Sequence, residues 1–75
     1  MNEDLLNYLV ATEENNIGDV LGCLNRYGAW IEEIDASDKK TEKEIMCKIS
    51  SSDMRDFETW LLSHKNIKVK ITKIT

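Results

Sequence analysis

The sequence predicts a small α+β domain whose strands and helices follow the order βαββαβ. The first observation is that apolar residues recur every three or four positions in two segments, which is typical of helices. The second is that four other segments are either continuously apolar or apolar at every second position, which is typical of strands. The third observation is the length, because 75 residues are enough for one domain and no more. We therefore expect a single domain over residues 1–75.

The first half of the chain predicts a strand followed by a helix. Leu5–Thr12 is rich in β-forming residues and is apolar at both alternating sets of positions, which favours a central strand. Over 17–27 the apolar residues have helical spacing, and Gly28 follows as a C-terminal cap. Gly22 lowers the helix propensity of this segment, so we expect it to mark close packing of the helix against the sheet.

The middle of the chain predicts a β-hairpin. The second strand, 29–36, breaks strict alternation at Ile31 and Ile34, and a β-bulge would reconcile the two residues. Ser37–Lys40 is polar and forms the turn. The third strand is Glu44–Ile49, where every second residue is apolar and shares one face.

The last part predicts a second helix and a closing strand. Ser51–Asp53 offers residues that cap a helix, and an apolar stripe continues to about residue 64. His64 lies at the end of this helix, where positive charge suits the helix dipole. Ile67–Thr72 then alternates as the fourth strand.

Elements in this order form the split βαβ arrangement of ferredoxin-like folds, a four-stranded antiparallel sheet with two helices on one face. The first and third strands are then central, and both carry apolar residues for a face that the helices leave bare. These are either Leu6, Tyr8 and Val10 or Leu5 and Leu9 on the first strand, and Met46 on the third, with Lys68 and Lys70 at one edge. Such a face tends to be covered by another chain, so we expect a homodimer or docking to a larger protein.

The charge is distributed unevenly. The net charge of −4 argues against a protein that binds nucleic-acid phosphates. Residues 1–38 carry nine acidic residues against one basic residue, a net −8, whereas residues 39–75 carry nine basic residues against five acidic ones, a net +4. This division predicts either an interaction surface, such as two copies with opposite charges facing, or neutralisation across neighbouring strands.

No residue pattern in the chain indicates catalysis, a metal site or a cofactor. Cys23 and Cys47 are far apart within apolar patterns, which indicates buried free thiols. A single histidine excludes a histidine-rich metal site. Neighbouring carboxylates such as Glu13-Glu14 and Glu32-Glu33 point to opposite faces of a strand, so neither pair converges on a metal ion.

The sequence also bears on location. No segment approaches the roughly 20 apolar residues of a membrane span, and the first residues, Met1–Asp4, lack the basic region of a signal peptide. We therefore expect a cytoplasmic chain with no direct membrane contact.

The segment Glu14–Leu21, followed by Gly28–Ile31, resembles the opening of ACT-type regulatory domains, whose pattern is D-x-P-G-x-L, a helix and G-x-N-I. The resemblance implies one ACT-like domain over residues 1–75. In that family the loop before the first helix and the adjacent dimer interface bind amino acids or similar small effectors. Carried over by position, this implies a candidate effector loop made of Asn15, Asn16, Ile17, Gly18 and Asp19, in which Gly18 presents its backbone.

The match to the pattern is partial. Asn15 stands where the family has aspartate, Ile17 where it has proline, and Trp30 where a small polar residue is common. The order of strands and helices also resembles the cytoplasmic C-terminal domain of MgtC-type magnesium-transport proteins.

The sequence therefore predicts a non-catalytic regulatory or interaction domain that dimerises or docks through its sheet. Its possible small-molecule effector would bind at the first strand-helix loop. The alternative is a small acidic interaction module, an inhibitor or adaptor, that presents its N-terminal acidic residues to a basic partner. An enzyme of acylphosphatase type on the same fold is disfavoured, because its phosphate-binding loop carries arginine and the first loop here is acidic.

Overall fold

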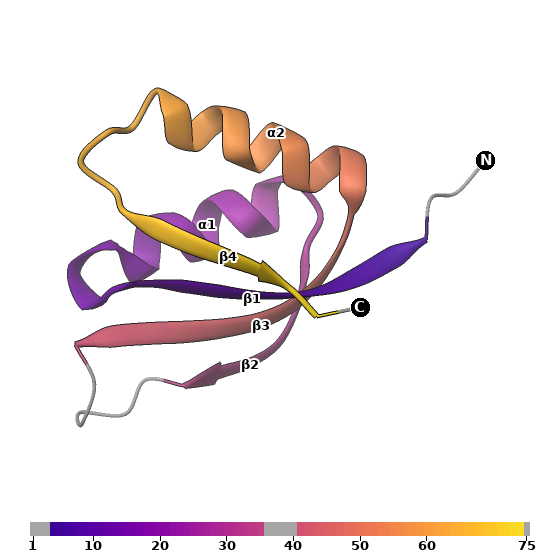
Figure 1. The fold of residues 1–75 in the computed structure, drawn as a ribbon, viewed down its shortest axis with the longest axis horizontal. Helices are drawn as coiled ribbons and strands as arrows, with labels where there is room; N and C mark the ends of the chain where they lie inside the picture. Colours follow the sequence, from indigo (N-terminus) through magenta and orange to yellow (C-terminus); the bar gives the residue numbers. More distant parts are fainter. Residues whose placement is uncertain (1–3, 36–40, 75) are drawn as a thin grey trace.

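The structure, a computed structural model, describes residues 4–35 and 41–74. Four antiparallel strands form one sheet in the order β2-β3-β1-β4, and both helices lie on the same face of it (Figure 1). The elements in chain order are β1 (Leu5–Glu13), the 3-10 turn η1 (Glu14–Asn16), α1 (Ile17–Arg26), β2 (Trp30–Asp35), β3 (Glu42–Ser50), α2 (Ser51–Leu62) and β4 (Val69–Lys73). This is the predicted α+β, ferredoxin-like fold with β1 and β3 at the centre.

The core lies between the helices and the inner face of the central strands. Alternate residues of β1 and β3 are buried there, because side chains on a strand point alternately to opposite faces. Tyr8 pairs with Cys47, and Val10 pairs with Ile45. The helices close this layer with fully buried side chains, namely Val20 and Leu24 from α1 and Phe57 from α2.

A β-bulge in β2 confirms the interpretation of the broken alternation. The register of β2 against β3 shifts between Ile31 and Glu33, so that Ile31 pairs with Cys47 and Ile34 with Ile45. Both isoleucines therefore lie on the helix side of the sheet, although they are three positions apart. Glu32 is the additional residue of the bulge, because it has no pairing partner in β3.

The end of α1 is also as predicted. Gly28 has a φ of +83°, a conformation that glycine adopts without steric cost. Its N–H donates to the carbonyl of Asn25 at 3.1 Å, and the N–H of Ala29 donates to that of Leu24 at 3.0 Å. These two bonds form a Schellman motif, which satisfies the last helical carbonyls.

The ends of α2 differ from the prediction. The capping side chain is Ser50, whose Oγ accepts a hydrogen bond from the Asp53 N–H at 3.2 Å, so the prediction of caps at Ser51–Asp53 was wrong. Ser50 is both the last residue of β3 and the N-cap, because the chain turns directly from strand into helix. The helix ends at Leu62, and β4 begins at Val69, two residues after the predicted start.

Gly22 does not mark close packing, which corrects the sequence-based expectation. It is exposed, and a Cβ atom added to it would meet no atom within 4 Å. Cys23 and Cys47 are buried free thiols, as predicted. The predicted turn at Ser37–Lys40 lies outside the described residues. Within 4–35 and 41–74, no helix is long and apolar enough to cross a membrane.

Candidate functional site

The face of the sheet opposite the helices, called the open face below, carries the alternate side chains of all four strands. Its strand pairing defines three rows across β2, β3, β1 and β4. Ile74 belongs to it because its N–H donates to the carbonyl of Asn7 at 2.8 Å, which extends the β4 ladder by one residue. We name the rows aromatic (Trp30, Lys48, Asn7, Ile74), apolar (Glu33, Met46, Leu9, Thr72) and charged (Asp35, Glu44, Ala11, Lys70).

Large apolar side chains on the open face are in contact with solvent. Trp30 is 69% exposed, Leu5 54% and Ile74 46%, and they make up three of the five large hydrophobic residues exposed in the described part of the chain. Leu9 and Met46 lie between them, half-buried by their neighbours on the central strands. The face is therefore apolar along its middle and at both ends of the aromatic row.

Charge is separated between the two edges of this face. On the β2 edge the exposed side chains of Glu33 and Asp35 are acidic, and on the β4 edge Lys70 is basic. Nearer the centre, Lys48 Nζ lies 4.0 Å from Glu32 Oε2, which links β3 to the bulge of β2. The uneven charge of the sequence thus becomes an acidic edge and a basic edge, with two strands between them.

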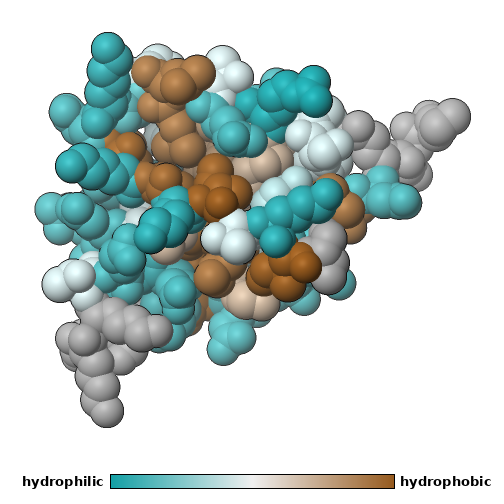
Figure 2. All heavy atoms as spheres, viewed as in Figure 1, coloured by the Kyte–Doolittle hydropathy of each residue, from teal (hydrophilic) through white to brown (hydrophobic). Residues whose placement is uncertain are grey.

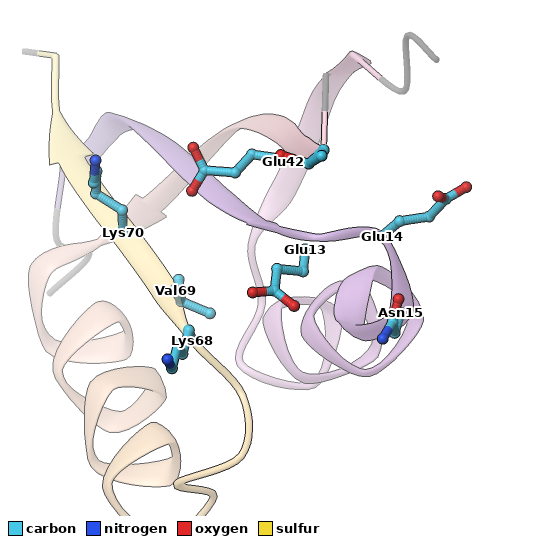
Figure 3. Close-up of a pocket in the computed structure, with 8 residues that line it drawn as sticks. Glu13, Glu14, Asn15, Glu42, Lys68, Val69 and Lys70 are labelled. Carbon is cyan, nitrogen blue, oxygen red and sulfur yellow. The ribbon is translucent and has the colours of Figure 1, made fainter. Parts of the chain in front are cut away.

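The first residues of the predicted effector loop lie at one end of the open face. Asn15 and the preceding residues Glu13 and Glu14 line a depression of about 470 Å³ together with residues from two other segments, namely Thr41, Glu42, Lys68, Val69 and Lys70. Glu42 extends towards Lys70, whereas Glu14 points away from β4 (Figure 3). Thr12 Oγ1 donates to the carbonyl of Lys68 at 3.2 Å, so the end of β1 is tied to the residue before β4.

The structure does not gather the other loop residues at this depression. Asn16 is the N-cap of α1 without a side-chain capping bond, and Ile17 packs against the core. Gly18 and Asp19 line a second, smaller depression of about 270 Å³, which Trp60 of α2 also lines. Asn15 belongs to the short turn η1, whereas Gly18 and Asp19 belong to the first turn of α1.

Gly18 has no conformational need to be glycine. Its φ is not positive, and a Cβ atom there would meet nothing within 4 Å. The surface of α1 around Gly18 is therefore not covered by another part of the described chain.

A third surface, between α2 and β4, was missed by the sequence analysis. Figure 2 shows hydrophobic side chains gathered where α2 lies along β4. They form part of a groove of about 650 Å³ whose lining includes Leu61, Leu62, Val69 and Ile71. Leu62 is 76% exposed. The signal was present in Leu62, which continues the apolar pattern of α2 beyond the side of the helix that the sheet covers.

Two aromatic contacts organise the end of α2. The ring of Trp60 stacks on His64 at a centroid distance of 4.1 Å and on Phe57 at 6.1 Å. His64 Nδ1 lies 2.8 Å from the carbonyl of Trp60, and since a carbonyl only accepts, Nδ1–H is the donor. His64 thus satisfies a carbonyl at the end of the helix.

The buried thiols of Cys23 and Cys47 are protonated and unreactive at neutral pH. Burial raises the pKa of Cys47 to about 11, and the Glu32 carboxylate adds to this shift. Burial also raises the pKa of Cys23, against a smaller opposite effect of Arg26. Since the thiolate is the nucleophile, both groups remain in the unreactive form. Among the residues that the structure describes, no group of three His, Cys, Asp or Glu side chains is placed to hold a metal ion.

The chain matches no sequence family, and no curated protein matches it either.

Proposed function

We propose that this chain is a small, non-catalytic regulatory or interaction domain that acts by docking through the open face of its sheet. The observation that carries the proposal is the exposure of Trp30, Leu5 and Ile74 around Leu9 and Met46. Burying one large apolar side chain contributes about 1.5–3 kcal/mol, so covering this face is favourable. The resemblance of the first loop to ACT-type regulatory domains supports the same conclusion.

A matched pair of substitutions tests this function. Trp30→Asp places a charge on the open face, and Leu62→Asp places the same charge on α2, away from that face. Both side chains are highly exposed, 69% and 76%, so neither substitution should disturb the core. We expect sedimentation velocity over a range of concentrations to show self-association that Trp30→Asp removes and Leu62→Asp leaves intact. Equal effects of the two variants would contradict docking through the open face.

The depression at the end of the open face is the candidate effector site. Its lining includes two basic residues, Lys68 and Lys70, and the acidic residues Glu13 and Glu42, a combination that suits a small molecule carrying both charges, such as an amino acid. An NMR titration with the common amino acids should shift the amides of Lys68 and its neighbours in the depression. Lys68→Ala should abolish the response, and shifts confined to Gly18 and Asp19 would place the ligand elsewhere.

The acidic edge supports the alternative function, an acidic adaptor or inhibitor. Glu32 and Glu33 are exposed on an edge strand, where a basic partner has access to both. Reversing these two charges should abolish binding of a lysine-rich peptide in calorimetry, whereas reversing Asp56 on α2 should not. Equal binding by the two variants would exclude recognition by the β2 edge.

A further inference from the structure

We propose that the open face is covered by a second copy of this chain, related to the first by a two-fold axis parallel to the strands that passes between β1 and β3. The inference rests on the proposed docking through the open face and names the partner and its orientation. It follows from the distribution of apolar and charged side chains along the three rows.

The first argument is the fit of the apolar residues. A two-fold axis in this direction places β3 of one copy over β1 of the other, and each edge strand over the opposite edge strand. Met46 then faces Leu9 of the second copy, and by symmetry Leu9 faces its Met46. In the aromatic row, Trp30 at the β2 edge meets Ile74 at the β4 edge. The same rotation therefore covers two of the most exposed apolar side chains of the face.

The second argument is the fit of the charges. In the charged row, the same axis brings Asp35 of one copy opposite Lys70 of the other, and this contact occurs twice. Glu33, one row away, adds to the negative potential that Lys70 meets. Opposite charges across an interface fix its orientation more than its affinity, so the edge charges select this axis.

The other simple arrangement is unfavourable. A two-fold axis in the plane of the sheet but perpendicular to the strands would place β2 over β2. With that axis through the apolar row, Glu33 would face Glu33 of the second copy, and like charges placed opposite one another across an interface are unfavourable. Trp30 would meet the acidic end of that strand instead of Ile74. Packed sheets cross at about 30°, a rotation too small to exchange one edge for the other.

The size of the face sets the expected affinity. Four strands about 4.8 Å apart, with about seven residues each at about 3.3 Å, give roughly 450 Å² of flat area per copy. Two copies would bury roughly 900 Å², below the range of standard stable interfaces. We therefore expect a dimer with a dissociation constant in the micromolar range.

A charge exchange in the full chain tests the orientation. Lys70→Glu and Asp35→Lys should each weaken the dimer about tenfold, because each creates two repulsive contacts. The double variant should restore the wild-type dissociation constant, measured by sedimentation equilibrium. Lys73→Glu is the control, since Lys73 is an exposed lysine of β4 that points to the helix side. An additive loss in the double variant would overturn this orientation.

A fluorescence measurement distinguishes this proposal from the more general one. In a Trp60→Phe background, Trp30 is the sole tryptophan, and its emission should shift to the blue as concentration rises through the dissociation constant. If that shift occurs but the charge exchange gives no rescue, docking through the open face stands and this orientation is wrong. A chain that stays monomeric at millimolar concentration, with no blue shift, overturns the second copy as the partner.

Discussion

Replacing Gly22 with alanine should stabilise this protein. Glycine in the middle of a helix costs about 1 kcal/mol relative to alanine, and nothing within 4 Å would clash with the added methyl group. Because Gly22 is the sixth residue of a ten-residue helix, almost the whole difference should be gained, which gives about 0.8–1 kcal/mol. For a domain of this size that raises the melting temperature by about 4–8 °C. Thermal unfolding followed by circular dichroism measures it.

Gly28→Ala is the matched control, for which we expect the opposite effect on stability. Its φ of +83° would cost an alanine about 1–2 kcal/mol, although the space around it is sufficient, since the nearest atom to an added Cβ would be Asp53 Oδ2 at 3.8 Å. We expect this variant to melt lower than the wild type. A destabilised Gly22→Ala variant would refute the reasoning, because it would mean that the exposed side of α1 is in contact with another surface.

Three further predictions concern the core and the start of α2. Ser50→Ala removes the side chain that accepts the Asp53 N–H and should lower the free energy of unfolding by about 1 kcal/mol in urea titrations; no change would mean that water replaces the cap. Phe57→Leu, at a position with no exposed surface, should cost about 1–2 kcal/mol by the same assay, and a smaller loss would indicate that the core closes around the smaller side chain. The pKa of the Cys47 thiol is about 11 in the folded chain against an ordinary 9.0, so above about pH 9 the unfolded chain loses a proton that the folded chain keeps, and stability falls as pH rises. The free energy of unfolding should be about 1 kcal/mol lower at about pH 10 than at about pH 8, and Cys47→Ala should reduce that difference; an equal pH dependence in both proteins would assign it to other groups.

The topology could be predicted from the sequence because its signals are local. The spacing of Ile31 and Ile34 indicated a bulge, and Gly28 indicated the end of a helix, since each feature depends on its immediate neighbours. The apolar residues at both sets of positions in β1 placed that strand at the centre of the sheet. The sequence left open which set of residues faces the helices. The structure places Val10 towards the helices and Leu9 on the open face.

Features that depend on the relative placement of elements could not be predicted in the same way. Ser50 caps α2 because β3 ends there, and the sequence offers three neighbouring residues with equal capping ability. Gly22 lies on the side of α1 that faces away from the core. Helix propensity cannot predict which side of a helix a residue occupies. The residues from Asn15 to Asp19 divide between two depressions, because Asn15 lies in η1 while Gly18 and Asp19 lie in the first turn of α1. A sequence motif does not show where a 3-10 turn ends and an α-helix begins.

The bulge at Glu32 also bears on the kind of assembly this chain can form. β2 is an edge strand with backbone groups that could add the strand of another molecule, and repeated addition would give an open-ended filament. A bulge interrupts the regular spacing of those groups and twists the edge, and at the opposite edge lysines flank the exposed backbone of β4. Growth by extending the sheet is therefore disfavoured on both sides. Contact through the open face ends with two molecules. The bulge that places Glu33 and Asp35 on the same face as Trp30 therefore also keeps association finite.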